Sequence, residues 1–271
     1  MNKNLFRVIA AAAFIALVWP FGWQVITSLK APAEIFSDKL TFIPENIYLQ
    51  NYAGVFDSGP PFGLYLVNSA VIAGTATFLC LLFGSLCGYA LARLPMKGKN
   101  LILALMLGVA MFPQVAVLSP LFLTLRSMGL LNTHIGLALV YTSFGLPLAV
   151  WLLTNFFREL PSELEEAALV DGCTPLSVLC KIVLPVAYPG LFSAAILVFI
   201  YCWNEFLFAL VFNTSLNMRT VTVGITMFPG MYETPWGTLF AAATTVTVPL
   251  IILVFIFQRR IVSGLTAGAI K

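Results

Sequence analysis

The sequence predicts an all-α polytopic membrane protein with six transmembrane helices and one ordered polar loop between two of them. Hydrophobic residues make up 60% of the 271 residues and charged residues only 9%, and the mean hydropathy is +0.98. A water-soluble chain of this length does not need so apolar a composition. The apolar residues also form long runs, which favours helices, because lipid offers no partner to an unpaired backbone group. We therefore expect residues 1–271 to form a single transmembrane domain.

Six apolar segments have about the 20 residues that a helix needs to cross the hydrocarbon core. Their approximate limits are residues 8–28, 64–91, 101–125, 135–156, 191–212 and 239–257. Five segments contain no charged residue, and the segment 191–212 contains Glu205. Prolines within three of the segments predict kinks, at Pro113, Pro120, Pro147 and Pro249.

The first segment follows Lys3 and Arg7, as the apolar part of a signal peptide would. Bulky residues, Trp19, Pro20 and Trp23, stand where a signal peptidase would need small ones. We therefore expect this segment to remain as the first membrane helix.

Basic residues predict the orientation, because cytoplasmic segments carry the excess of lysine and arginine. With the N-terminus inside, 10 of the 14 basic residues fall on the inner side and 4 on the outer side. The inner residues are Lys3, Arg7, Arg93, Lys97, Lys99, Arg158, Lys181, Arg259, Arg260 and Lys271, and the outer ones are Lys30, Lys39, Arg126 and Arg219. Both termini are therefore expected in the cytoplasm. The net charge of +3 reflects this asymmetry and does not indicate nucleic acid as a partner.

Two outer stretches, residues 29–63 and 213–238, are long and rich in turn residues. They either form the seat for an external partner or simply connect the spans, and their composition fits both interpretations.

The inner loop 158–189 predicts two short helices joined by a tight turn. Ser162 and Glu165 have the spacing of a capping box, in which the serine oxygen accepts an early backbone N–H and the glutamate reaches back. Gly172 suits the left-handed residue that ends a helix.

The second helix of the loop should begin at Thr174 and Pro175, a capping hydroxyl followed by proline at the first helical position. Pro185 and Pro189 are expected to end it before the fifth segment.

On the first helix, acidic residues stand near the positive helix start and small apolar residues form a narrow stripe. The acids are Glu163, Glu165 and Glu166, and the stripe is Leu164, Ala167 and Ala168. The loop is therefore predicted to be a rigid helix-turn-helix.

This loop resembles the EAA loop by which permease subunits of ATP-binding-cassette (ABC) importers dock onto separate ATPase subunits. The matching residues are Glu166-Ala167-Ala168, Gly172, Ile182 and Leu184-Pro185. Three further stretches are similar to the carbohydrate branch of these permeases: Asp171-Gly172, Trp203-Asn204-Glu205-Phe206 and the ending from Phe257-Gln258-Arg259-Arg260 to Lys271. We refer to residues 158–189 below as the coupling loop.

The resemblance implies a permease subunit of a binding-protein-dependent importer in the bacterial cytoplasmic membrane. Its partners would be a second, homologous permease, two ABC ATPase subunits, an external solute-binding protein and the surrounding lipid. The cargo would be a sugar or small glycoside: a disaccharide, an oligosaccharide or a glycosylated osmolyte. The residues that couple to the ATPase would be Glu163, Glu166, Ala167, Ala168, Asp171, Gly172, Ile182, Leu184 and Pro185.

ATP and Mg²⁺ would bind to the partner ATPase, because this sequence has no Gly-x4-Gly-Lys-Ser/Thr phosphate cradle. Gly98-Lys99-Asn100 lacks both the leading glycine and the hydroxyl. We expect the chain itself to be no enzyme and to bind no cofactor or metal. His134, the sole histidine, is expected to be structural, and the five cysteines are expected to be free thiols.

A carboxylate at the centre of a spanning helix costs about 2.5 to 3.5 kcal/mol, so Glu205 should face protein or water. It either lines the substrate path together with Asn204 or has a structural role. Candidates for the path are residues that offer hydrogen bonds or aromatic faces to a polyol. They are Asn68, Gln114, Tyr141, Asn155, Tyr201, Trp203, Asn204 and Glu205.

Two alternatives to the importer stay open. One is a secondary transporter coupled to protons through Glu205, and the other is a membrane scaffold without a transport role. The coupling loop favours the importer, because a carrier driven by an ion gradient needs no dock for an ATPase.

Overall fold

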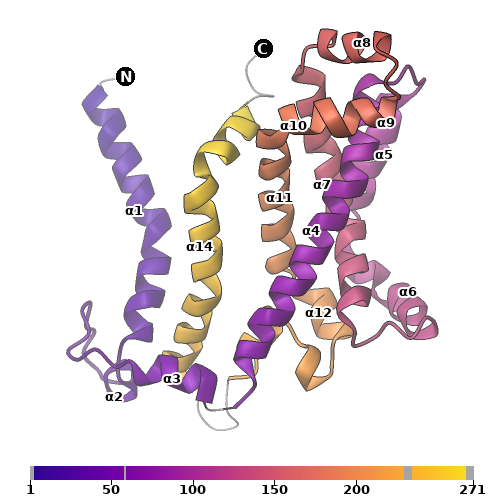
Figure 1. Ribbon diagram of the computed structural model, residues 1–271. Helices are drawn as coiled ribbons and strands as arrows, with labels where there is room; N and C mark the ends of the chain where they lie inside the picture. Colours follow the sequence, from indigo (N-terminus) through magenta and orange to yellow (C-terminus); the bar gives the residue numbers. More distant parts are fainter. Residues whose placement is uncertain (1–2, 58, 229–233, 267–271) are drawn as a thin grey trace.

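The computed structural model of the chain is a bundle of helices, drawn in Figure 1. It describes residues 3–57, 59–228 and 234–266, with side chains up to residue 258. Every regular element in these described ranges is a helix, so the predicted all-α fold is confirmed. Residues 229–233 and 267–271, which belong to the predicted outer stretch and the C-terminal resemblance, lie outside the described residues.

Four helices are long and apolar enough to cross a membrane: α1 (Lys3–Ser28), α4 (Phe62–Arg93), α7 (His134–Glu159) and the part Trp236–Gln258 of α14 (Trp236–Thr266). They contain the predicted segments 8–28, 64–91, 135–156 and 239–257. The start of α7 is fixed by Thr133, whose hydroxyl accepts the backbone N–H of Gly136 at 3.0 Å.

Segments 101–125 and 191–212 are each interrupted, and the kink predicted at Pro113 is confirmed. The first consists of α5 (Lys99–Ala110) and α6 (Gln114–Ser127), which meet at 88°. Pro113 at this bend has no N–H to continue the helix and keeps the preceding residue out of the helical region. The second consists of α11 (Tyr188–Trp203) and α12 (Leu207–Phe212), separated by the irregular residues 204–206.

The other helices are short connectors. On the outer stretches they are α2 (Pro32–Ile35), α3 (Gln50–Asp57), the 3-10 turn η2 (Leu216–Met218) and α13 (Val221–Ile225). The coupling loop contains α8 (Glu163–Val170), α9 (Pro175–Val178), the π-helical turn η1 (Leu179–Val183) and α10 (Leu184–Val186).

The centre of the bundle is the pair of α4 and α7, against which α11 packs. Glycines on α4 let the two helices approach closely. A Cβ added at Gly84 would lie 3.1 Å from the Cβ of Ala149, and one added at Gly88 would lie 3.2 Å from the Cβ of Leu153. By contrast, α1 contacts α14 but has no buried residue in its apolar window, so many of its apolar side chains face lipid or another protein.

The two ends of the bundle differ. The coupling loop, the beginning of α1 and the end of α14 lie at one end, and α2, α3, α6 and α12 lie at the other (Figure 1). This arrangement agrees with an even number of membrane crossings.

Candidate functional site

The turn of the coupling loop has the predicted geometry. Gly172 has φ +83°, in the left-handed region that favours glycine. Its N–H bonds the carbonyl of Leu169 at 3.1 Å, and the N–H of Cys173 bonds the carbonyl of Ala168 at 3.0 Å. These bonds satisfy carbonyls at the end of α8 and hold the two limbs of the loop together.

The second limb runs from Pro175 to Val186 as one helical stretch that includes η1. Its predicted start is confirmed, because the Thr174 hydroxyl accepts the backbone N–H of Ser177 at 3.3 Å. The helix ends at Val186, between Pro185 and Pro189 as predicted, and an 83° bend leads into α11. Within this limb, the π-helical turn bonds the N–H of Leu184 to the carbonyl of Leu179.

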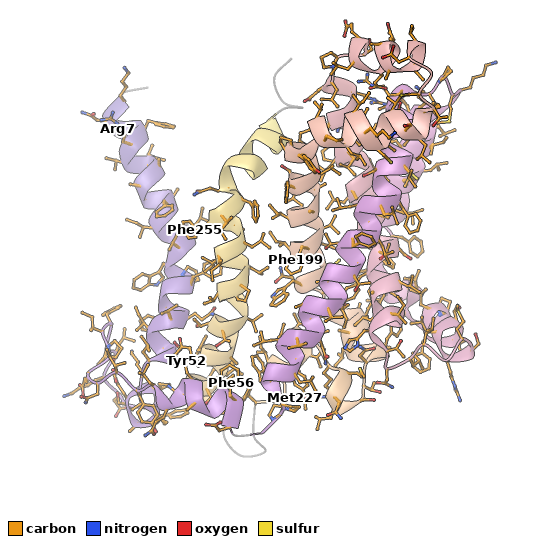
Figure 2. The ribbon with its side chains drawn as sticks, viewed as in Figure 1. Arg7, Tyr52, Phe56, Phe199, Met227 and Phe255 are labelled. Carbon is orange, nitrogen blue, oxygen red and sulfur yellow. The ribbon has the colours of Figure 1, made fainter. Side chains whose placement is uncertain are left out.

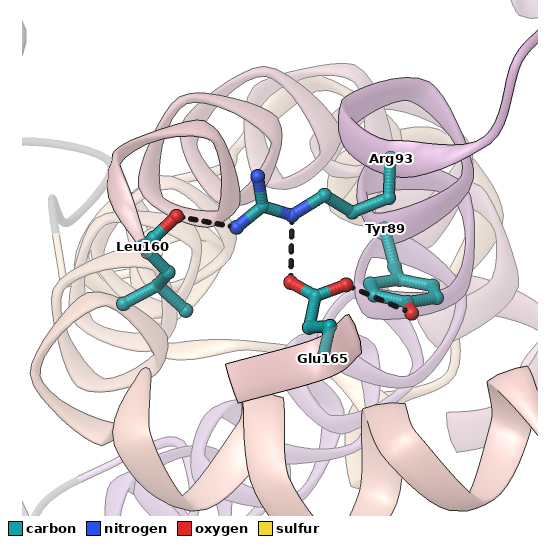
Figure 3. A network of polar contacts seen from close by, with 4 residues as sticks. All are labelled: Tyr89, Arg93, Leu160 and Glu165. Atoms are coloured by element: carbon teal, nitrogen blue, oxygen red, sulfur yellow. Dashed lines mark hydrogen bonds and ion pairs between the residues drawn. The ribbon is translucent and has the colours of Figure 1, made fainter. Parts of the chain in front are cut away.

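The predicted capping box is also wrong. Ser162 makes no side-chain cap to α8, and Glu165 points to α4 instead. Figure 3 shows its partners: Arg93 Nε lies 2.7 Å from Glu165 Oε1, and the Tyr89 hydroxyl donates to Oε2 at 3.1 Å. Arg93 Nη2 also donates to the carbonyl of Leu160 at 2.6 Å. A buried carboxylate gains more from a guanidinium and a hydroxyl than from the neutral N–H that a capping box offers.

Sequence reasoning missed Arg93 and Tyr89 as parts of this site. A signal existed, because Glu165 and Ala168 are three residues apart and would share the inward face of α8. Both are indeed the buried residues of α8. The carboxylate of Glu165 needs a basic partner there, and Arg93 at the end of α4 supplies it.

The other predicted coupling residues divide between two faces. Ala168 is buried, and Ile182 and Leu184 are partly buried in the apolar cluster that seats the loop on α7. The exposed residues are Glu163, Glu166, Ala167, Asp171, Gly172 and Pro185. Beside them lie exposed apolar side chains, including Val170 at 87% exposure, Leu169 and Leu176. An acidic rim around apolar side chains on a rigid support is a surface suited to another protein.

The interrupted helices bring part of the predicted substrate path together. Gln114, which begins α6 after the bend, donates from Nε2 to the Tyr201 hydroxyl oxygen on α11 at 3.1 Å. One turn further on, the exposed Asn204 donates to the carbonyl of Ile200 at 2.8 Å. One hydrogen bond therefore joins the residue after the first break to the last turn of α11, just before the second break.

Glu205 lies in the irregular residues 204–206 and caps α12. Its Oε1 accepts the N–H of Phe208 at 2.9 Å, and its Oε2 accepts the N–H of Ala209 at 3.2 Å. Its main-chain carbonyl accepts the Thr222 hydroxyl at 2.8 Å. The carboxylate is 7% exposed, and these donors account for a buried acid at this depth.

Four predicted path residues lie elsewhere or are covered. Tyr141 and Trp203 are buried in the main apolar core, and Trp203 stacks on Phe199 with ring centroids 5.6 Å apart. Asn155 lies near the end of α7 that carries the coupling loop. Asn68 lies at the opposite end of α4, where its Nδ2 donates to the carbonyls of Asn217 and Arg219, both at 2.9 Å.

The fold and the coupling loop define a class: a multi-pass membrane permease that another protein drives. The chain belongs to the family of binding-protein-dependent transport system inner membrane components, whose model matches residues 80–267. This range contains the coupling loop and both interrupted helices. The predicted ABC-importer permease is therefore confirmed, and the proton-coupled carrier is not favoured.

Individual relatives agree along the full length. A sulfoquinovosyl glycerol transport system permease of Agrobacterium fabrum is 43% identical over 270 residues, which cover 100% of this chain and 94% of the relative. A trehalose/maltose transport system permease of Thermococcus litoralis is 40% identical over 272 residues, which cover 99% and 97%. A trehalose transport system permease of Mycobacterium tuberculosis is 42% identical over 254 residues, which cover 93% and 92%.

A solved structure supports the fold. A chain from the crystal structure of a bacterial ABC transporter involved in the import of the acidic polysaccharide alginate superposes with a TM-score of 0.79. The two are 20% identical, and the match covers 95% of this chain and 97% of that chain.

Proposed function

We propose that this chain is one of two permeases that enclose the path of an ATP-driven importer for a saccharide or small glycoside. It would lie in the bacterial cytoplasmic membrane, with the coupling loop and both termini in the cytoplasm. The observation that carries the proposal is the outward face of α8, with acids around exposed apolar side chains on a loop that is otherwise tied to the bundle.

The partner ATPases would bind this face and hold ATP and Mg²⁺. Glu163, Glu166 and Asp171 are all exposed there and favour a partner surface with basic residues. Because Gly172 fixes the turn and the second limb is seated on α7, closure of the ATPases would displace the loop as a unit. This displacement would switch the helices between the two openings of an importer.

The path would run past the interrupted helices. A broken helix leaves backbone carbonyls and N–H groups without helical partners, and those that no other group of the chain engages can bind the hydroxyls of a polyol. Gln114, Tyr201 and Asn204 add side-chain groups at the same point. Glu205 would hold the start of α12 and would need no change of protonation during transport.

The cargo class follows from the relatives, whose names specify sulfoquinovosyl glycerol, trehalose or maltose. All of these are glycosides, although they differ in charge and size. An external solute-binding protein would select among them before the permease does.

The test is uptake by the purified complex of this chain, its second permease, the ATPases and the binding protein in liposomes. Labelled trehalose, maltose and sulfoquinovosyl glycerol are offered in turn, with ATP and Mg²⁺ inside or withheld. We expect accumulation of at least one glycoside that requires ATP and persists when an uncoupler is added. Uptake without ATP, or uptake abolished by the uncoupler, contradicts the proposal.

A further inference from the structure

The two ends of α4 hold different loops through buried polar side chains. At one end, Arg93 and Tyr89 hold Glu165 of the coupling loop. At the other end, Asn68 holds the connection 213–220 between α12 and α13, by donating to the carbonyls of Asn217 and Arg219. The spans themselves are apolar, so such polar anchors are few and strong in this protein.

The second anchor is reinforced by neighbouring side chains. Ser69, which is also buried, accepts the N–H of Val221 on its hydroxyl at 2.9 Å. The Tyr65 hydroxyl donates to the sulfur of Met227 at 3.7 Å, and Figure 2 shows Met227 at the end of the bundle away from the coupling loop. The connection 213–220 and α13 are therefore fastened to the first turns of α4.

The neighbouring helix α7 is tied to α4 at the same two places. Arg93 bonds the carbonyl of Leu160, which directly follows α7, and His134 Nε2 donates to Asn68 Oδ1 at 2.8 Å at the start of α7. Between these ties, Gly84 and Gly88 bring the two helices into close contact. Because packed interiors resist deformation, the pair should move as one body.

We propose that α4, braced by α7, is a strut that makes the connection 213–220 follow the movement of the coupling loop. Asn68 and Arg93 are 25 residues apart on one helix, which corresponds to about 37 Å at 1.5 Å per residue. Displacement of α8 by the ATPases pulls Arg93 through Glu165, and the carbonyls held by Asn68 move with the other end of α4. Glu165, Arg93 and Asn68 are positioning residues of transport in this scheme, which rests on the proposed function.

The coupling must also act in reverse, since linkage between two sites is reciprocal. A partner that holds the connection 213–220 on the outer face would change the position of the coupling loop under the ATPases. The strut therefore gives an external contact a physical route to the site of ATP hydrolysis.

The experiment measures the connection while changing only the nucleotide. Leu216→Cys places a thiol on a half-exposed position of the connection in the complete complex, held in lipid nanodiscs. Its reaction rate with a membrane-impermeant maleimide is read by mass spectrometry of that peptide, without nucleotide and with ATP, Mg²⁺ and orthovanadate. We expect the nucleotide to change the rate by about fivefold or more, the size of ordinary allosteric coupling.

Glu165→Gln and, separately, Asn68→Ala should each abolish this change while the ATPases stay bound. The double variant Arg93→Glu with Glu165→Arg exchanges the two charges and should restore the nucleotide response. A response that was lost only because the protein is less stable would not be restored in this way. The matched control is Glu159→Gln, an exposed acid at the end of α7, which should leave the change intact. If Glu165→Gln fails to assemble, Tyr89→Phe removes a single hydroxyl from the same anchor and should weaken the change.

The strut is overturned if the full nucleotide response is retained when either anchor is removed. The first anchor is tested by Glu165→Gln or Tyr89→Phe, and the second by Asn68→Ala. Loss of the response in the Glu159→Gln control also overturns it. The absence of any response in the unchanged complex also overturns the strut. ATP-dependent uptake by the same complex in liposomes would still support the proposed function, so the two failures are distinguishable.

Discussion

Glu205 is the acidic residue for which the sequence leaves two roles open, and its contacts indicate the structural one. Its two carboxylate oxygens accept the N–H groups of Phe208 and Ala209 at the start of α12. A proton on this carboxylate would remove acceptor capacity that α12 needs. The same group is therefore poorly suited to load and release protons in each transport cycle.

A first prediction concerns Glu205→Gln. The amide keeps one acceptor oxygen and loses the other, so the free energy of unfolding should fall by about 1 to 3 kcal/mol. ATP-dependent uptake should remain, at a changed rate, and should resist an uncoupler. Uptake in vesicles with ATP clamped, together with the thermal midpoint in detergent, measures both effects. A variant that is fully stable but cannot accumulate cargo would return the proton-coupled carrier to consideration.

A second prediction concerns Gly172, which occupies the left-handed region with φ +83°. Gly172→Val puts a β-branched residue there at a cost of about 1 to 2 kcal/mol, which the exposed turn can avoid by changing its shape. We expect uptake to be lost while the chain still inserts into the membrane. Immunoblots of membrane fractions and uptake assays are compared, with Gly172→Ala as the milder control. Normal uptake by the valine variant would mean that the turn is not part of the coupling.

At the scale of elements, the close pair of α4 and α7 gives a third prediction. A Cβ at Gly88 would lie 3.2 Å from Leu153 Cβ and from Thr154 N, so Gly88→Leu should push the helices apart. We expect a loss of about 1 to 3 kcal/mol of stability and a large loss of coupled hydrolysis. Gly74→Leu on the same helix is the matched control, because a Cβ there meets nothing within 4 Å. Equal thermal midpoints for the two variants would contradict the packing argument.

The sequence predicted the positions of the membrane helices better than the breaks within them. Hydropathy located every apolar segment, because the membrane requires a minimum length of apolar chain. It did not show the breaks at 111–113 and 204–206, since an interrupted helix can be as apolar as a straight one. Pro113 did predict a kink at the first break. The second has no such signal, because Glu205 supports the break only through contacts with the N–H groups that follow it.

The coupling loop shows the same limit. The turn at Gly172 and the cap at Thr174 are local and were predicted correctly. The role of Glu165 was not predicted, because its partner Tyr89 is 76 positions away in the sequence. The serine of the predicted capping box is much closer to Glu165 in the sequence than Tyr89 is. A local pattern and a tertiary contact competed for one carboxylate, and the tertiary contact prevailed. The assignment of residues to the substrate path stays a prediction.

At the scale of the whole molecule, the beginning of α1, the end of α14 and the coupling loop lie at one end of the bundle (Figure 1). The fourth prediction uses the native thiols of that loop: Cys173, which is partly exposed, and Cys180, which is exposed. A membrane-impermeant maleimide should label both in inside-out vesicles, and labelling should fall once the ATPases bind. The buried Cys80 and Cys202 serve as internal controls that stay unlabelled. Labelling of Cys180 in intact cells would place the loop outside and reverse the topology.

The π-helical turn Leu179–Val183 has a consequence for how the chain can change length. A π turn holds one residue more than an α turn, so a deletion within it would leave a regular α-helix in place of a gap. The part of the second limb before the deletion would then keep its orientation, because a π turn and an α turn each complete about one rotation and differ in the number of residues they use. Exposed Leu176 would stay on the face that it now occupies. A single lost codon in this turn would thus leave the docking surface in place, whereas the same loss in a regular part of the limb would rotate the residues before it by about 100°.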